Sequence, residues 1–500
     1  MTLIPPLTLL AAQKVADCLE KSTFLFKSPA LHPGCLPMTV SALPATLTDL
    51  VLRLHQEKHG ELTETQWEVV YQSGIFAASR LDTSGIPLTS MDLKTIKRNH
   101  YTSFKLGYGE PMEEDEHDQV SESTFMRSVL NKRCRQQLKV LDLSGSRDIS
   151  RFWPSRLLPR LPNLCTLILA NRPISKRVLK EVSVRCPQLK CLDISCTGIT
   201  DISSLAAFER LEVLITHDLH VESGFDALKA LSNLRVLDVS VIDVSEASLA
   251  EYVLRKSRKA LQKRKASPWP QLRSLDLGGS NMTSENIKIV IDAHPKLQEL
   301  LAYGSPLEEL NLRPGLKVLS PIEMAGRYMA TDRPIFVHDL LREIFFRATM
   351  MDAPMSRSEV VELLRLAQQV ILKHAGDREM VYQAVMGINH LLANWKGNNV
   401  SVSQVQTTAD LLSKLAEHPD YSTPTEIAEI IQYWIWESLS KRDIIEAIED
   451  SLEIARLAAR ILLKPWSQLV KRNLRAFQVR RLEHYMNMLL LKDVMLGRPA

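Results

Sequence analysis

The segment with the residue types of a catalytic or metal site is THDLH, which contains His217, Asp218 and His220. Imidazole and carboxylate groups at this spacing can act as general acids and bases or bind a divalent metal. The segment lies where a predicted strand ends, and the chain's other histidines are scattered without the spacing of metal ligands. We therefore interpret the three residues as surface positions.

Other motifs of enzyme chemistry are missing. The sequence has no Walker loop, no GxSxG elbow and no HExxH pair, and GYGE at 107–110 offers only two glycines. Seven cysteines include no CxxC pair, and Cys186, Cys191 and Cys196 are spaced by five. This usage favours reduced, partly buried thiols, as in cytoplasmic or nuclear proteins. We expect a protein that is not an enzyme and has no cofactor, no bound metal and no catalytic residue.

A different chemistry, insertion into a hydrophobic groove, is suggested by PLTLLAAQKV near the start of the chain. Leu7, Ala11 and Val15 are four residues apart and share one face of a predicted helix. A large, a small and a branched apolar side chain in this order suit docking into the groove of a partner. The alternative is that the helix packs on its own domain. The stretch is too short and too interrupted for a secretory signal or a membrane span.

The elements that would position such a helix are repeats of the pattern L-x-x-L-x-L/I/V. Its first leucines are 22 to 26 residues apart, with one interval of 38. This period is typical of leucine-rich repeats. The seven first leucines are Leu138, Leu164, Leu189, Leu211, Leu234, Leu272 and Leu297. The pattern predicts an α/β solenoid in which leucines point inward and polar residues line a concave sheet.

The return segments of the repeats should cover the convex side as helices. In ITDISSLAAFERL, the apolar residues Ile202, Leu205 and Phe208 recur every three residues. The long interval contains the basic stretch 255–265, which is either a helix extension with a loop or a nuclear-localisation or nucleic-acid patch. The acidic run EEDEHD at 113–118 is expected to be a flexible loop. The net charge of +4 does not require nucleic acid or a membrane as a partner.

The last third of the chain changes to amphipathic helical segments separated by short breaks. Six or more such segments predict an all-α, armadillo- or HEAT-like stack, with a compact bundle as the alternative. Its densest aromatic cluster is Tyr433, Trp434 and Trp436. These side chains cannot all share one narrow helix stripe, so the cluster is either a candidate substrate-binding site or packing between helices.

The two N-terminal segments resemble known docking boxes. The first resembles an elongin-C-binding box, Ser/Thr/Ala/Pro-Leu-x-x-x-Cys-x-x-x-aliphatic, with Ala11 in place of Cys. LPATLTDLV resembles a cullin-2-selecting box, aliphatic-Pro-x-x-aliphatic-x-x-x-aliphatic, at Leu43, Pro44, Leu47 and Val51. Together with the repeats and the helical region after them, this order resembles a short or divergent member of the Zyg-11/Zer-1 family.

This resemblance implies a function and partners. Family members are substrate receptors of cullin-2 RING ubiquitin ligases, so the resemblance implies elongin C with elongin B, cullin-2 and protein substrates as partners. The alternative is a leucine-rich-repeat scaffold with no role in ubiquitin transfer, whose first helices cap the solenoid. The expected domains are a helical box region at 1–60, an N-terminal cap at 61–137, leucine-rich repeats at 138–320 and an armadillo-like domain at 335–500.

Overall fold

The protein is described from a computed structural model of the 500-residue chain, which forms two compact units, Met1–Leu319 and Ser320–Ala500. The residues that the structure describes are 9, 12, 13, 15, 16, 19, 44–59, 62, 64–72, 76–83, 100–107, 130–145, 153–306, 313–331, 333–350, 356–374, 377, 380, 381, 383–385 and 387.

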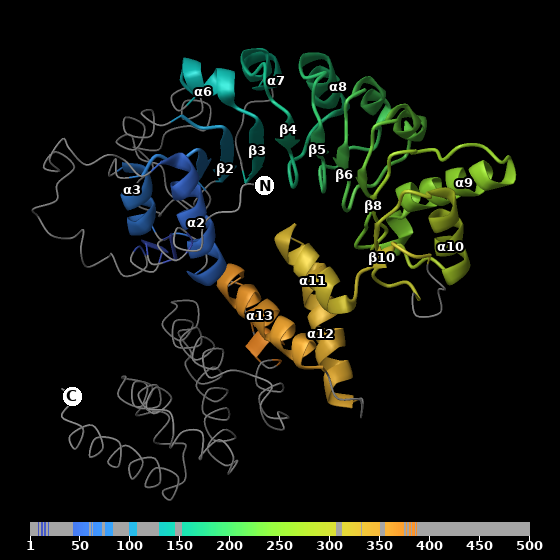
Figure 1. The fold of residues 1–500 in the computed structure, drawn as a ribbon. Helices are drawn as coiled ribbons and strands as arrows, with labels where there is room; N and C mark the ends of the chain where they lie inside the picture. The colour runs from blue at the N-terminus through green and yellow to red at the C-terminus, as the bar shows by residue number, and fades with distance from the viewer. Residues whose placement is uncertain are drawn as a thin grey trace, which may run out of the picture. The chain divides into compact units, whose positions relative to one another are not determined.

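The first unit is a leucine-rich-repeat solenoid built on a parallel sheet. Ten strands pair in chain order from β1 to β10, so each repeat adds one strand beside the previous one. Strands line the inner side of the curved repeat array and helical segments cover its outer side (Figure 1). The strands are β1 (Arg80–Asp82), β2 (Ser103–Gly107), β3 (Val140–Gly145), β4 (Thr166–Ile168), β5 (Cys191–Asp193), β6 (Val213–Ile215), β7 (Val236–Asp238), β8 (Ser274–Asp276), β9 (Glu299–Leu301) and β10 (Lys317–Val318).

The repeat leucines form the continuous core of this unit. The middle residue of each strand from β3 to β9 is a leucine with no exposed surface, and neighbouring middle leucines are register partners. Each repeat alone is too small to bury this face, so the stacked neighbours supply the rest of the core. The predicted leucine-rich-repeat solenoid is therefore the fold of this unit.

The sheet begins two strands earlier than the sequence pattern indicated. β1 and β2 lie in 61–137, which was predicted to be the N-terminal cap of the solenoid, and they pair in parallel with each other and with β3. Ala78 and Tyr101 occupy the position of the first leucine, and both are buried. The leucine pattern missed these repeats because different apolar residues fill the same core positions.

The convex side is covered by short helical segments rather than by long helices. They are α6 (Lys132–Gln137), α7 (Trp153–Leu157), η2 (Leu158–Arg160), α8 (Lys176–Arg185), η3 (Ser203–Ala207), η4 (Phe225–Ala230) and η5 (Val244–Glu246). The helix predicted around Leu205 is the 3₁₀ helix η3, with Ile202, Leu205 and Phe208 fully buried. Their spacing of three matches the three residues per turn of a 3₁₀ helix.

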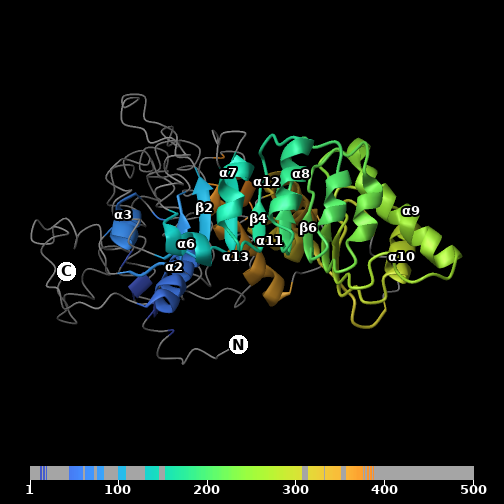
Figure 2. The same ribbon diagram turned by 90° about the horizontal axis from the view of Figure 1, so that it is seen from above.

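The 38-residue interval adds one long helix to the convex side. α9 (Ser248–Gln262) packs on α10 (Ser284–Ala293) (Figure 2), and the chain then continues into β8. Trp269 in this loop is 1% exposed, and its indole N–H donates to the carbonyl of Leu228 at 2.8 Å. The insertion is therefore anchored in the core, and its exposed basic residues lie on α9 and in the turn that follows it.

The second unit is described over three helices, α11 (Pro321–Ala330), α12 (Pro334–Met350) and α13 (Arg357–Lys373). α11 and α13 each begin with a capping box, Ser320 with Glu323 and Ser356 with Glu359. Three helices do not establish a repeat class, so the armadillo-like assignment of 335–500 stays a prediction. Across the described part of both units, no helix has the length and apolar character needed to cross a bilayer.

Candidate protein-interaction site

The inner surface of the repeat sheet presents an aliphatic row. Strand residues before the buried leucine point to this side, and in β3, β6 and β7 they are Val140, Val213 and Val236, each half-buried. The residues after the buried leucine include the half-buried Ile168 and Ile215. Aliphatic side chains that are partly open on a sheet face can contact the apolar residues of a partner. The sequence pattern predicted polar residues here and missed this aliphatic component, although these positions recur beside the leucines.

Carboxylates alternate with these aliphatic residues along the same surface. Asp142, Asp193, Asp238 and Asp276 occupy one register position on β3, β5, β7 and β8. In the first three, one carboxylate oxygen accepts hydrogen bonds from the backbone N–H and hydroxyl of the serine two residues later, at 2.6–3.0 Å. The recurring Asp-x-Ser thus fixes the ends of these three strands. Asp142 and Asp193 are half-buried and make the inner surface partly acidic, whereas Asp238 and Asp276 are buried.

The polar cluster THDLH is divided between the two sides of a strand end. His217 is buried, and its Nδ1 lies 2.9 Å from the hydroxyl of Ser240, which donates to Asp238. His220 is exposed beside Glu222. No group of three His, Cys, Asp or Glu residues that could hold a metal occurs among the described residues. The prediction that all three residues lie at the surface is therefore wrong for His217, because its imidazole is buried against Ser240 of the next repeat.

The described cysteines are free thiols. Burial raises the pKa of Cys186 and Cys191 to about 11, so both stay protonated at neutral pH. Low-pKa thiolates are the reactive form of cysteine. Neither residue therefore has the character of a nucleophile.

The first docking-box segment contributes residues to the solenoid core. Ala12, Ala16 and Leu19 are at most 4% exposed, and Val15 is half-buried against the same core. Leu9 is 37% exposed. Leu7 and Ala11 lie outside the described residues. The segment therefore packs on its own domain through one stripe and keeps Leu9 at the surface.

The second docking-box segment lies on α2 (Ala45–His59). Pro44 is exposed, Leu47 is half-buried and Val51 is 1% exposed, while Leu43 lies outside the described residues. The burial of Val51 disagrees with its prediction as a cullin contact, because its side chain faces the core. α2 is tied to the repeats by Asp49, whose carboxylate accepts from the hydroxyl of Ser79 at 2.5 Å.

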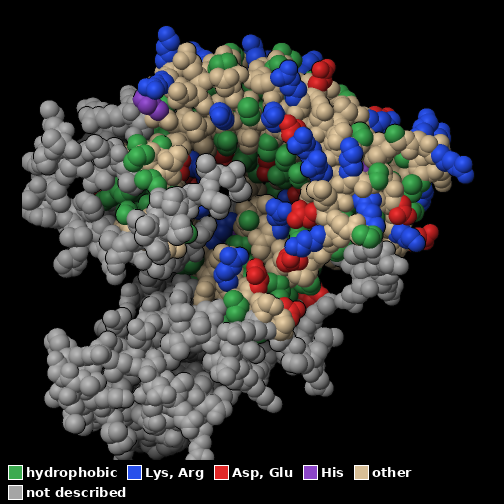
Figure 3. Space-filling model, in the orientation of Figure 1, with side chains coloured by type: hydrophobic (Ala, Val, Ile, Leu, Met, Phe, Trp, Pro, Cys, Tyr) green, Lys and Arg blue, Asp and Glu red, His purple; other side chains and the backbone are tan. Residues whose placement is uncertain are grey.

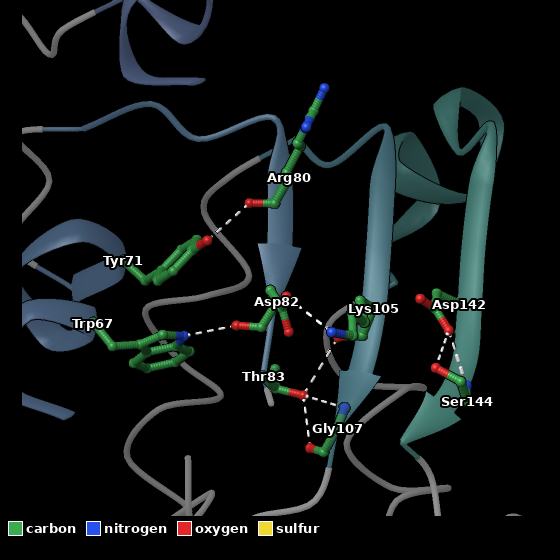
Figure 4. A network of polar contacts seen from close by, with 9 residues as sticks. All are labelled: Trp67, Tyr71, Arg80, Asp82, Thr83, Lys105, Gly107, Asp142 and Ser144. Atoms are coloured by element: carbon green, nitrogen blue, oxygen red, sulfur yellow. Dashed lines mark hydrogen bonds and ion pairs between the residues drawn. The ribbon is translucent and has the colours of Figure 1, made fainter. Parts of the chain in front are cut away.

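Aromatic residues of α3 (Glu64–Gln72) cap the first strand of the sheet (Figure 4). The indole N–H of Trp67 donates to the carbonyl of Asp82 at 2.9 Å, and the hydroxyl of Tyr71 donates to the carbonyl of Arg80 at 3.1 Å. Both side chains are buried and their ring centroids lie 4.9 Å apart. Among the described residues no strand pairs with the outer side of β1, and these two donors satisfy its carbonyls, so α3 closes this end of the sheet.

The remaining site prediction, Tyr433, Trp434 and Trp436, lies outside the described residues, as does the acidic run 113–118. The basic stretch 255–265 is described. It continues α9 through Gln262, with Ser257 and Ala260 buried and Lys263, Arg264 and Lys265 exposed. The structure thus shows a helix extension whose charged side chains face outward.

Comparison with known proteins supports the repeat class. Residues 185–299 match the family model described as Zer-1-like, leucine-rich repeats. Gastrulation-defective protein 3 of Caenorhabditis elegans is 26% identical over 218 residues. That match covers 43% of this chain and 29% of the relative's length, so it spans less than a third of that protein.

Two solved structures also contain segments similar to this chain. An internalin, InlF, from Listeria monocytogenes is 16% identical over 49% of this chain and 67% of its own, with a TM-score of 0.31. TLR13, solved as a TLR13–ssRNA13 complex, is 15% identical over 49% of this chain and 39% of its own, with a TM-score of 0.27. Residues 185–299 of this chain are thus similar to Zer-1-like leucine-rich repeats.

Proposed function

We propose that the chain is a non-catalytic substrate-recognition subunit of a cullin-2–elongin B/C RING ubiquitin ligase, which recruits target proteins for ubiquitination and degradation. The observation that carries this proposal is the similarity of residues 185–299 to Zer-1-like leucine-rich repeats. The order of the chain supports it, because two segments with the spacing of docking boxes precede the repeats.

The inner repeat surface is suited to holding a protein target. It combines half-buried aliphatic side chains with carboxylates on a parallel sheet whose strands are rigidly stacked. Such a surface gives apolar contact area and charge-based selection. In this role the chain raises the local concentration of the target near the ubiquitin-conjugating machinery, while the transfer chemistry belongs to the partners.

The experiment is a binding assay of the purified chain with the elongin B–C pair. Leu7→Asp puts a charge into the box position that enters the groove, and burying it there should cost several kcal/mol, roughly a hundredfold or more in affinity. Leu9→Asp is the matched control, because it adds the same charge two residues away at an exposed position. We expect loss of binding in the first variant and retention in the second, with both folded by circular dichroism.

A second candidate function is a protein-interaction scaffold outside the ubiquitin pathway. The burial of Ala12, Ala16 and Leu19 favours it, because a helix that closes the end of a solenoid explains those residues without any partner. If the wild-type chain shows no binding to elongin B–C at micromolar concentrations, the ligase proposal is wrong and the scaffold replaces it. Either function is proposed for the cytoplasm, the nucleus or both, which microscopy of the tagged chain tests.

A further inference from the structure

The segments that enter the strands of the repeat sheet are mainly basic. In the six residues before each strand from β3 to β9, nine positions are Lys or Arg, and two, Glu209 and Glu212, are acidic. In the eight residues after each of β5, β6 and β7, five positions are acidic and none is Lys or Arg. Because all strands are parallel and in register, the segments before the strands align into one basic edge, where the strands begin, and those after β5, β6 and β7 form a shorter acidic stretch where these three strands end.

Five cations of the first edge have no hydrogen-bond or ion-pair partner in the described part of the chain, and we call them the basic edge. Two of them end convex helices, where a cation also offsets the carbonyl end of the helix. All five side chains are exposed, and Lys and Arg side chains are spread along the visible side of the repeats (Figure 3). The basic edge consists of Lys139, Arg160, Arg185, Arg210 and Arg273.

An ion pair within the chain, made by the carboxylate of Glu212, shows how cations of this edge hold an acidic group. Glu212 stands directly before β6, and its carboxylate lies 2.9 Å from Nζ of Lys190 and 3.5 Å from the guanidinium of Arg235 on the two neighbouring repeats. The hydrogen bond from Lys190 lowers the pKa of Glu212. The cations before β5 and β7, each about 4.8 Å along the sheet from Glu212, therefore hold its carboxylate between them. Arg273 continues the same row on β8 without such a partner.

The edge is also a rigid platform. Amide side chains connect the loops of successive repeats: Asn163 donates to the carbonyl of Gln136 at 2.7 Å, and Gln188 donates to the carbonyl of Pro162 at 2.9 Å. These bonds fix the loops that carry the cations. A fixed backbone holds the Cα positions of the cations in a constant row, so less backbone freedom is lost when a partner binds.

The side chains of the edge favour carboxylates over nucleic-acid bases. Single-stranded nucleic acids bind through aromatic stacking platforms together with cations. In the segments that form this edge the aromatic residues are Phe208 and Trp269, which are 0% and 1% exposed and so offer no stacking surface. Arginine guanidinium groups match carboxylate geometry with two parallel hydrogen bonds. We propose that the basic edge binds an acidic, extended polypeptide segment of a partner protein.

The test measures fluorescence polarisation of a labelled ten-residue glutamate peptide with the full-length chain at low salt. The edge variant is Lys139→Glu/Arg185→Glu/Arg273→Glu. The matched control is Lys180→Glu/Lys259→Glu/Lys288→Glu, which changes the net charge equally at exposed helical positions of the same repeats. We expect the edge variant to lose about tenfold or more in affinity and the control to stay within about twofold, with binding that falls steeply as salt rises. The assay contains only the chain and the peptide, so its result does not depend on the ligase proposal.

Three outcomes would overturn the inference. The first is an equal loss of affinity in both triple variants, which would show a response to net charge alone. The second is that the wild-type chain does not bind the glutamate peptide. The third is that it binds a labelled single-stranded oligonucleotide more tightly than the peptide. If the glutamate substitutions reduce folding by circular dichroism, the corresponding glutamine triple replaces them, because it removes the same three charges without adding acids to the edge.

Discussion

Acidification should destabilise the repeat unit through His294, and the size of the effect follows from its surroundings. The imidazole is 1% exposed, stacks on Trp269 with ring centroids 5.7 Å apart, and lies near the hydroxyls of Ser267 (2.7 Å) and Ser257 (3.2 Å). Burial lowers the pKa of His294 from 6.5 to about 4, and the positive charge of Arg313 acts in the same direction. The folded protein therefore holds this imidazole neutral at pH values where the unfolded chain protonates it.

The sign and size of this pH effect on stability follow from the linkage between proton binding and folding. Since the pKa is lower in the folded state, the unfolded state binds more protons below pH 6.5, and the free energy of unfolding falls as the pH falls from 6.5 to about 4. The full difference is about 3 kcal/mol, of which about 2 kcal/mol is already lost at pH 5. Near pH 7 the contribution is close to zero.

The assay is urea unfolding followed by circular dichroism at pH 7 and pH 5. His294→Gln replaces the titrating imidazole with an amide that can hydrogen-bond to the same hydroxyls. We expect the loss of stability between the two pH values to be smaller in this variant than in the wild type by about 2 kcal/mol. His220→Gln, at an exposed histidine of the same unit, should leave the wild-type loss unchanged. An equal pH dependence in the wild type and His294→Gln would refute the reasoning.

Three further changes test the architecture. Trp67→Phe removes the donor to the carbonyl of Asp82 at the first strand and should lower the free energy of unfolding by about 1–3 kcal/mol, with faster hydrogen exchange in β1 and β2 as the local sign. Leu192→Ala, at a fully buried repeat position, should cost about 2–5 kcal/mol by urea unfolding, and a cost below 1 kcal/mol would contradict the proposed core. Gly224→Ala should destabilise by about 1–3 kcal/mol, because φ is +83° and a Cβ would lie 2.3 Å from the backbone N of Ser203; an unchanged thermal midpoint would argue against this turn.

The repeat core could be predicted from the sequence because its signal is local. Leucines at fixed offsets within nine residues define the strand and its buried side, and those residues are buried as the pattern indicated. The same reasoning failed for β1 and β2, where Ala78, Tyr101 and Phe104 replace leucines in equivalent positions. The core accepts any apolar side chain of suitable volume, whereas a letter pattern does not.

The docking-box segments show the opposite case. Their spacing indicates a helix face that is apolar, but an apolar face can pack on its own domain or bind a partner. Leu47 and Val51 share the face predicted for α2, yet the first is half-buried and the second is in the core. That distinction depends on the repeats that happen to lie beside the helix, which are far away along the chain.

By itself the sequence determined the repeat period, the inward-facing leucines and the family resemblance of this protein, because each depends on residues close together in the chain. Only the tertiary structure decided how residues of different repeats combine. The in-register parallel sheet brings side chains about 22 to 38 residues apart within one strand spacing of each other. That stacking creates the alternating aliphatic and acidic inner surface and the basic edge, neither of which exists in any single repeat.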